Sequence, residues 1–190
     1  MWIDENGWCS QIQKVPSPHF NDRPLNEKIT MIVIHNISLP AGCFGTCCVK
    51  DLFLGCLDCS YDSSFVDLKD LRVSSHFYID RKGLISQFVS CQKRAWHAGV
   101  SSLRNRQNCN DFSIGIELEG TDFVAFEPVQ YQKLSELCKV LSTHYPITSI
   151  VGHSDIAPGR KTDPGPSFDW MELKHLGPID AHLYPFQVDD

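Results

Sequence analysis

Apolar residues follow one another almost without a break over residues 30–37, and His35 is the marked exception. A continuous apolar run of this length is typical of a strand buried on both faces of a sheet. Residues 113–119 instead alternate in polarity, which predicts a second strand with two unlike faces. One face carries Ile114, Ile116 and Leu118, and the other carries Gly115, Glu117 and Glu119. We expect the second face to look at solvent, at a polar site or at the N-terminal segment.

Two shorter stretches, 76–79 and 84–89, flank a polar stretch that contains Gly83. This arrangement predicts a β-hairpin with glycine in the turn. Residues 128–145 carry an apolar stripe at helical spacing, with Pro128 suited to the first turn and Pro146 after the end. A short strand is expected over residues 149–152.

The length of 190 residues and the absence of internal repeats indicate a single domain over residues 1–190. Residues 1–28 are polar and rich in turn formers, so we expect an irregular N-terminal wrap. Residues 40–75 are interpreted as a loop-rich insertion with a short helix near residues 49–57. The strands and helices together predict a mixed β-sheet with helices, in the α/β (mixed α+β) class.

Composition and charge exclude several classes of protein. The chain is 42% hydrophobic and 21% charged, which is ordinary for a globular protein. The net charge is -6 and no basic stripe occurs, so we expect no nucleic-acid partner. No apolar run reaches a transmembrane length, and the acidic N-terminus lacks the apolar region of a signal peptide. We therefore expect a cytoplasmic protein with no membrane partner.

The chain has nine cysteines, an odd number that favours reduced thiols in a cytosol. Five of them lie within seventeen residues: Cys43, Cys47, Cys48, Cys56 and Cys59. The last two have C-x-x-C spacing, so a structural zinc site is one hypothesis. Leucine and phenylalanine residues alternate with these thiols, which favours the interpretation that several of them are small hydrophobic residues.

The chemically richest segment is 152–166, where prolines and glycines accompany His153, Lys161 and Asp163. Together with His35, the histidine and aspartate make a set of two imidazoles and one carboxylate. Such a set suits zinc with one coordination position left for water. Spacing alone does not establish that the three residues converge, and His76 is an alternative ligand in place of His35 or His153.

Two further residues suit hydrolysis at such a site. Glu117 could take the proton of a water near the metal, and the second carboxylate at Glu119 would tend to raise one pKa of the pair. Lys161 could place a cation where an oxyanion develops. A solvated strand face and a solvated loop lysine are the plainer alternatives.

Residues 93–97 combine Lys93 and Arg94 with Trp96 and His97, and Arg72 is a further cation that we consider with them. A patch of cations and aromatic rings suits a substrate with a carboxylate and a sugar ring. It is equally compatible with ordinary structure.

Six segments carry a resemblance to a known family: residues 15–19, 33–40, 71–74, 93–102, 109–122 and 161–170. In these segments the chain resembles the cytosolic AmpD-type N-acetyl-anhydromuramyl-L-alanine amidases of bacteria, which belong to the amidase/peptidoglycan-recognition superfamily. The similarity extends from about Gly7 to Trp170. The resemblance implies a central mixed β-sheet flanked by helices.

It also implies one catalytic zinc ion held by His35, His153 and Asp163, with Glu117 and Lys161 as catalytic residues. The implied reaction is hydrolysis of the amide between anhydro-N-acetylmuramic acid and L-alanine in anhydromuropeptides. In family members this step belongs to peptidoglycan recycling and removes inducers of β-lactamase expression. We expect a monomer. The substrate-binding residues expected are Asn36, Arg72, Trp96 and Arg106.

The chain departs from the family pattern at two places. Residues 41–66 are rich in cysteine, and Asn108 stands where an arginine is expected, so Arg104 or Arg106 would have to replace it. Two rival functions remain. One is a non-catalytic receptor for peptidoglycan fragments, which the complete ligand set disfavours. The other is a zinc protein built on the cysteine cluster.

Overall fold

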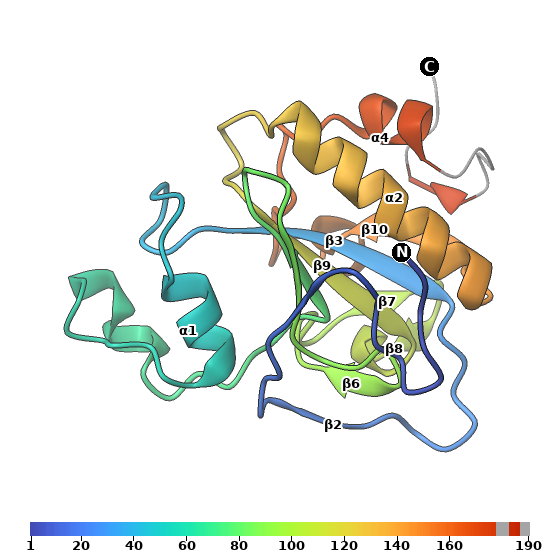
Figure 1. The fold of residues 1–190 in the computed structure, drawn as a ribbon, viewed down its shortest axis with the longest axis horizontal. Helices are drawn as coiled ribbons and strands as arrows, with labels where there is room; N and C mark the ends of the chain where they lie inside the picture. The colour runs from blue at the N-terminus through green and yellow to red at the C-terminus, as the bar shows by residue number, and fades with distance from the viewer. Residues whose placement is uncertain (178–182, 187–190) are drawn as a thin grey trace.

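The computed structural model describes residues 1–177 and 183–186 (Figure 1). Its centre is a six-stranded mixed β-sheet in the order β1-β5-β4-β9-β3-β10. All neighbouring strands are parallel except β4 and β5, which form an antiparallel hairpin. The sheet strands are β1 Gln13–Lys14, β3 Met31–Ile37, β4 Phe77–Ile79, β5 Ile85–Gln87, β9 Ser113–Glu119 and β10 Ser149–Gly152.

Helices and two small strand pairs surround this sheet. The helices are α1 Cys48–Leu54, α2 Pro128–His144, α3 His153–Ile156 and α4 Trp170–Leu176, with 3-10 turns at Ser63–Leu68 and Cys109–Asp111. The small pairs join β2 Phe20–Asp22 to β6 Lys93–Ala95 and β7 Ser102–Leu103 to β8 Arg106–Gln107. None of the helices in the described part of the chain is both long and apolar enough to cross a membrane.

Helix α2 covers one face of the sheet, with α4 packed beside it (Figure 1). The helix begins at Pro128, and Gln130 Oε1 in its first turn accepts the backbone N–H of Glu127 at 3.0 Å. Its predicted stripe packs on the even-numbered residues of β3 and β9 in the main core. This burial stabilises the sheet. It also fixes the strand orientation, so the odd-numbered residues of β3 and β9 point to the opposite face.

The odd-numbered residues of the central strands face the other side. Met31 and Val33 lie there in a small apolar cluster with Phe112 and Ile156. Further along β3, the same face carries His35 near the strand's carboxyl end. The carboxyl ends of the parallel strands β3, β9 and β10 therefore meet at one edge, where polar side chains can converge.

The structure confirms the mixed α/β fold, the hairpin, the long helix and the short helix within the insertion. The prediction of an irregular segment over residues 1–28 is wrong at β1 and β2. These strands have two and three residues, all exposed, so no hydrophobic alternation marks them. The segment that begins at His153 also starts with one helical turn, α3, before the Pro/Gly-rich loop.

Candidate metal centre and active site

Two histidines and one aspartate converge at the carboxyl edge of the sheet. His35 Nδ1 lies 2.9 Å from Asp163 Oδ2 and 3.0 Å from His153 Nδ1, and the latter atom lies 3.0 Å from Asp163 Oδ2. Three atoms about 3 Å apart can each lie about 2 Å from one ion, the distance zinc makes to histidine nitrogen and carboxylate oxygen. The three residues thus form a potential metal site, and their donor set fits zinc.

Strand register brings these groups together. His35 on β3 is the register partner of Glu117 on β9, so both side chains project from the same face of adjacent parallel strands. On the other side of β3, Gly152 at the end of β10 pairs with Ile34. His153 follows immediately and begins α3. Sequence positions more than a hundred residues apart therefore become neighbours through three parallel strands.

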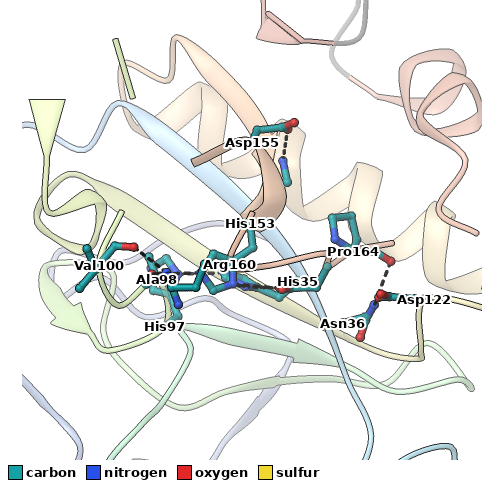
Figure 2. Close-up of polar contacts among 12 residues, drawn as sticks. His35, Asn36, His97, Ala98, Val100, Asp122, His153, Asp155, Arg160 and Pro164 are labelled. Carbon is teal, nitrogen blue, oxygen red and sulfur yellow. Dashed lines mark hydrogen bonds and ion pairs between the residues drawn. The ribbon is translucent and has the colours of Figure 1, made fainter. Parts of the chain in front are cut away.

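Hydrogen bonds and one close backbone approach hold the loop that carries Asp163 against this edge. Ser154 donates its backbone N–H to the Asp163 carbonyl at 2.9 Å. Asn36 donates from Nδ2 to the Pro164 carbonyl at 2.9 Å and to Asp122 Oδ1 at 2.8 Å (Figure 2). A Cβ added at Gly152 would lie 2.8 Å from Pro164 Cδ, so glycine is needed for this close approach.

Burial keeps the histidine of β3 neutral. It lowers the pKa of His35 to about 4, with the hydrogen bond to Asp163 opposing the shift. For Asp163 itself, burial raises the pKa, but hydrogen bonds with His153 and His35 outweigh it and the net shift is downward. A neutral imidazole and an ionised carboxylate are the protonation states that metal binding requires.

Glu117 is buried beside this group, with only 8% of the residue exposed. Its Oε2 has no hydrogen-bond partner among the described residues. Burial raises the pKa of Glu117 well above its usual range, the charge of Asp163 raises it further, and Lys161 lowers it. An unpartnered buried carboxylate beside two other charged groups is a functional-site feature rather than a solvated strand face.

Lys161 is exposed to solvent. Its charge lowers the pKa of both Glu117 and His35, which places it within electrostatic reach of each. Among residues 1–177 and 183–186, its ammonium makes no ion pair within 4.0 Å. The cation therefore remains available to a substrate.

The alternative ligand, His76, is not part of this group. Its Nδ1 accepts the backbone N–H of Gly115 at 3.0 Å, and its Nε2 lies 3.0 Å from the Lys93 carbonyl. Both ring nitrogens are therefore used within the fold. Burial and the neighbouring Arg23 lower the pKa of His76 to about 3, which keeps the ring neutral.

His97 belongs to the site, although its sequence context suggests only a patch of cations and aromatic rings. Its Nδ1 lies 2.9 Å from His35 Nε2 (Figure 2). Its Nε2 lies 3.1 Å from Ser113 Oγ. A Cβ at Gly115 would lie 2.5 Å from the His97 ring, so that glycine makes room for it. A glycine inside a strand is a known signal of such close approach, and it is visible in the sequence.

The expected substrate-binding residues are distributed unevenly. Asn36 lies at the site, where it links β3 to the Asp163 loop. Arg72 is exposed and donates to the carbonyls of Lys69 and Leu71, both at 3.4 Å. Trp96 donates from Nε1 to Asn21 and stacks on His19. None of these contacts of Arg72 and Trp96 is with a residue of the metal group.

Arg106 lies at the other end of the sheet. It donates to Glu27 at 2.9 Å and to Thr30 Oγ1 at 3.4 Å, and its guanidinium lies over the Phe112 ring. Thr30 precedes β3, whereas His35 is five positions further along, which is about 16 Å in an extended strand. The structure does not bring Arg106 to the metal group.

The cysteines form no comparable group. All nine thiols are free, with Cys43, Cys47 and Cys56 exposed and Cys48 buried. None of the described cysteines belongs to a cluster of three side chains that could hold a metal.

The family model of the N-acetylmuramoyl-L-alanine amidases (Amidase_2) matches residues 25–166 of the chain. The AmpD protein of Citrobacter freundii, named 1,6-anhydro-N-acetylmuramyl-L-alanine amidase, is 50% identical over 184 residues. The match covers 96% of this chain and 98% of that protein.

Solved structures give the same result. The crystal structure of a selenomethionine derivative of AmpD has a TM-score of 0.91 at 50% identity, covering 94% of this chain and 100% of that chain. The Escherichia coli amidase AmiD, in complex with the substrate anhydro-N-acetylmuramic acid-L-Ala-D-gamma-Glu-L-Lys, has a TM-score of 0.58 at 37% identity. That match covers 78% of this chain and 57% of that chain. The chain therefore belongs to the N-acetylmuramoyl-L-alanine amidase family and, within it, to the AmpD-type amidases.

Proposed function

We propose that this amidase is zinc-dependent and hydrolyses the amide between anhydro-N-acetylmuramic acid and L-alanine in anhydromuropeptides during peptidoglycan recycling. The observation that carries the proposal is the buried, unpartnered Glu117 carboxylate beside three atoms spaced for one cation. The names of the AmpD relatives and the substrate bound to AmiD support the choice of substrate.

His35, His153 and Asp163 would hold the ion. Zinc bound there would polarise the amide carbonyl and lower the pKa of a water toward about 7. Asp163 contributes a negative charge, and the two neutral imidazoles contribute none. The set therefore leaves a net positive charge for an oxyanion and one coordination position open.

Glu117 is proposed as the group that moves the proton. In the ionised form of Glu117, the free Oε2 accepts a proton from the attacking water while the water oxygen bonds to the amide carbon. Glu117 then delivers that proton to the nitrogen of L-alanine as the C–N bond breaks. The new carboxylic acid passes its proton to the released amine, so the products are the lactyl carboxylate and the ammonium of the peptide. One water is consumed, and Glu117 is regenerated.

Lys161 is proposed to stabilise the oxyanion of the tetrahedral intermediate. Its ammonium is free of ion pairs in the described structure and lies within electrostatic reach of Glu117. A preorganised cation aimed at developing charge typically contributes about two to three decades in rate. Asn36 would act by holding the Asp163 loop.

The wider setting is also a proposal. We place the reaction in the cytoplasm, where removal of anhydromuropeptides would lower the level of β-lactamase inducers. We expect residues 1–190 to act as a single-domain monomer, although residues 178–182 and 187–190 lie outside the described structure. Light scattering of the purified chain tests the monomer.

The experiment that tests the function is release of the peptide from a purified anhydromuropeptide, followed by mass spectrometry. We expect release by the zinc-loaded protein, loss on treatment with a chelator and recovery on addition of zinc. Binding of the anhydromuropeptide without any release would instead support the non-catalytic receptor. Release that persists after complete removal of metal would contradict the zinc-dependent mechanism.

A further inference from the structure

Two consecutive residues, His97 and Ala98, contact the Nε2 atoms of both histidines of the candidate metal centre. The ring nitrogen of His35 that points away from Asp163, Nε2, lies 2.9 Å from His97 Nδ1. The equivalent nitrogen of His153 lies 3.0 Å from the carbonyl oxygen of Ala98. Figure 2 shows these groups side by side. One short stretch of the chain therefore contacts both ligands.

These contacts are compatible with the tautomers that a metal needs. A carbonyl oxygen only accepts hydrogen bonds, so His153 carries its proton on Nε2 and leaves the Nδ1 lone pair facing Asp163. His97 has Ser113 Oγ beside its Nε2, and a proton there leaves its Nδ1 as an acceptor. With the His97 proton on Nε2, His35 donates from its own Nε2 and keeps a lone pair on Nδ1. Such partners orient metal-binding histidines and raise their basicity.

A single side-chain oxygen holds this two-residue stretch. Asn110 Oδ1 accepts the backbone N–H of His97 at 3.2 Å and that of Ala98 at 2.8 Å. Asn110 is itself anchored, because its carbonyl accepts a hydrogen bond from the partly buried guanidinium of Arg23 at 3.0 Å. Arg160 adds a second donor to the Ala98 carbonyl at 2.9 Å.

We propose that Asn110 is a positioning residue for the metal centre: by fixing the backbone of His97 and Ala98, its Oδ1 orients both histidine ligands. Asn110 has hydrogen bonds to His97, Ala98 and Arg23 and to neither ligand, so its effect passes through the two acceptors that it holds in place. The inference rests on the proposed function, since it assumes that His35 and His153 bind an ion.

The test is zinc affinity, measured by competition with a chromophoric chelator, in the full chain and three variants. Asn110→Leu removes the shared acceptor, and we expect zinc binding about 10- to 100-fold weaker, the usual effect of losing a supporting hydrogen bond. Asn110→Asp retains an oxygen in the same place, and we expect an affinity within about threefold of wild type.

The matched control is Ser101→Ala. Ser101 Oγ accepts the backbone N–H of Cys109 at 3.2 Å and donates to the Gly99 carbonyl at 3.2 Å, so it joins the same two chain segments without contacting residues 97 or 98. We expect its zinc affinity to equal that of wild type. If Asn110→Leu does not fold, Asn110→Ser provides the comparison, because its shorter side chain does not reach both amides.

A second readout is nitrogen-15 NMR of the histidine rings in the zinc-loaded protein. We expect His35 and His153 as single Nε2-protonated species in wild type and Asn110→Asp, and altered or exchange-broadened ring signals in Asn110→Leu. Unchanged zinc affinity and ring signals in Asn110→Leu would overturn the inference and leave the proposed function intact. Absence of zinc binding by wild type would overturn the proposed function, and the inference with it.

Discussion

Two regions of this molecule are rich in side chains that bind metals, and only one of them builds a site. His35, His153 and Asp163 are separated by up to 128 positions, yet their ligand atoms lie about 3 Å apart. The cysteine-rich segment, Cys43 to Cys59, concentrates five thiols within seventeen residues, and none of them joins a ligand group in the described structure.

Strand register, rather than proximity in sequence, therefore builds the centre. Three parallel strands deliver their carboxyl ends to one edge, and the Asp163 loop is bonded to that edge. The segment with the thiols instead folds as α1 and loops, with Cys48 buried and three thiols exposed. Substitutions in the two regions should accordingly have very different effects.

Removing a ligand should have the largest effect. For Asp163→Ala we expect zinc content to fall from about one equivalent to near zero and peptide release to fall by more than about 10³-fold, because two neutral imidazoles alone hold zinc poorly. Elemental analysis and the release assay measure both. Asp155→Asn, a change on the same segment that keeps an acceptor for Gly152, is the control and should retain zinc.

Glu117→Gln should separate binding from chemistry. The amide cannot accept the proton of the attacking water, so we expect kcat to fall by about 10²- to 10⁴-fold. Zinc content should remain at about one equivalent. Turnover close to wild type would remove Glu117 as the base.

Lys161→Ala should reduce kcat by about 10²- to 10³-fold, the usual effect of losing an oxyanion donor, with zinc retained. Lys161→Arg keeps the charge and should recover part of the loss. Equal rates for the alanine variant and wild type would mean that the exposed ammonium only contacts solvent.

Glu117 should also make the metal-free protein less stable at neutral pH. Burial raises the pKa of Glu117 in the folded state, so the native protein retains a proton that the unfolded chain has lost. The free energy of unfolding therefore falls as the pH rises above about 4, the usual pKa of a glutamate. We therefore expect metal-free Glu117→Gln to melt at a higher temperature than metal-free wild type at pH 7, by about 2–4 °C for each kcal/mol. The difference should disappear near pH 4, and a constant difference across this range would contradict it.

The smallest effect should come from the cysteines. Replacing Cys56 and Cys59 with serine should leave zinc content and peptide release within error of wild type, because neither thiol belongs to a ligand group. Loss of one equivalent of zinc in this double variant would restore the hypothesis of a structural cysteine site.

Much of the site is predictable residue by residue. His35 breaks an apolar strand, and Glu117 occupies the less apolar face of an alternating one, so the sequence alone marks both as candidates. Their convergence with Asp163 does not follow from spacing, because it depends on which strands pair and in which register. Family resemblance supplies that step.

Other features leave weak signals or none. The alternation of polarity predicts that Glu119 faces solvent, a polar site or the N-terminal segment. In the structure Glu119 is only 2% exposed, and its carboxylate accepts the backbone N–H groups of Gly45 and Arg81. Helix α4, which begins after an Asp169 cap, was not predicted because seven residues carry little periodicity. The role of Asn110 depends on contacts of its side chain with the backbone of His97 and Ala98, which no sequence pattern encodes. For His97, the glycine at position 115 is a weak signal.

If strand register assembles the metal centre, the bound ion must lie at the carboxyl edge of the sheet and nowhere among the cysteines. Anomalous scattering from crystals of the zinc-loaded protein, measured at the zinc absorption edge, locates it directly. We predict one strong peak, equidistant from the Nδ1 atoms of His35 and His153 and from Asp163 Oδ2, and no peak among residues 43–59. A peak among the cysteines, or none between the two histidines, would contradict this assignment.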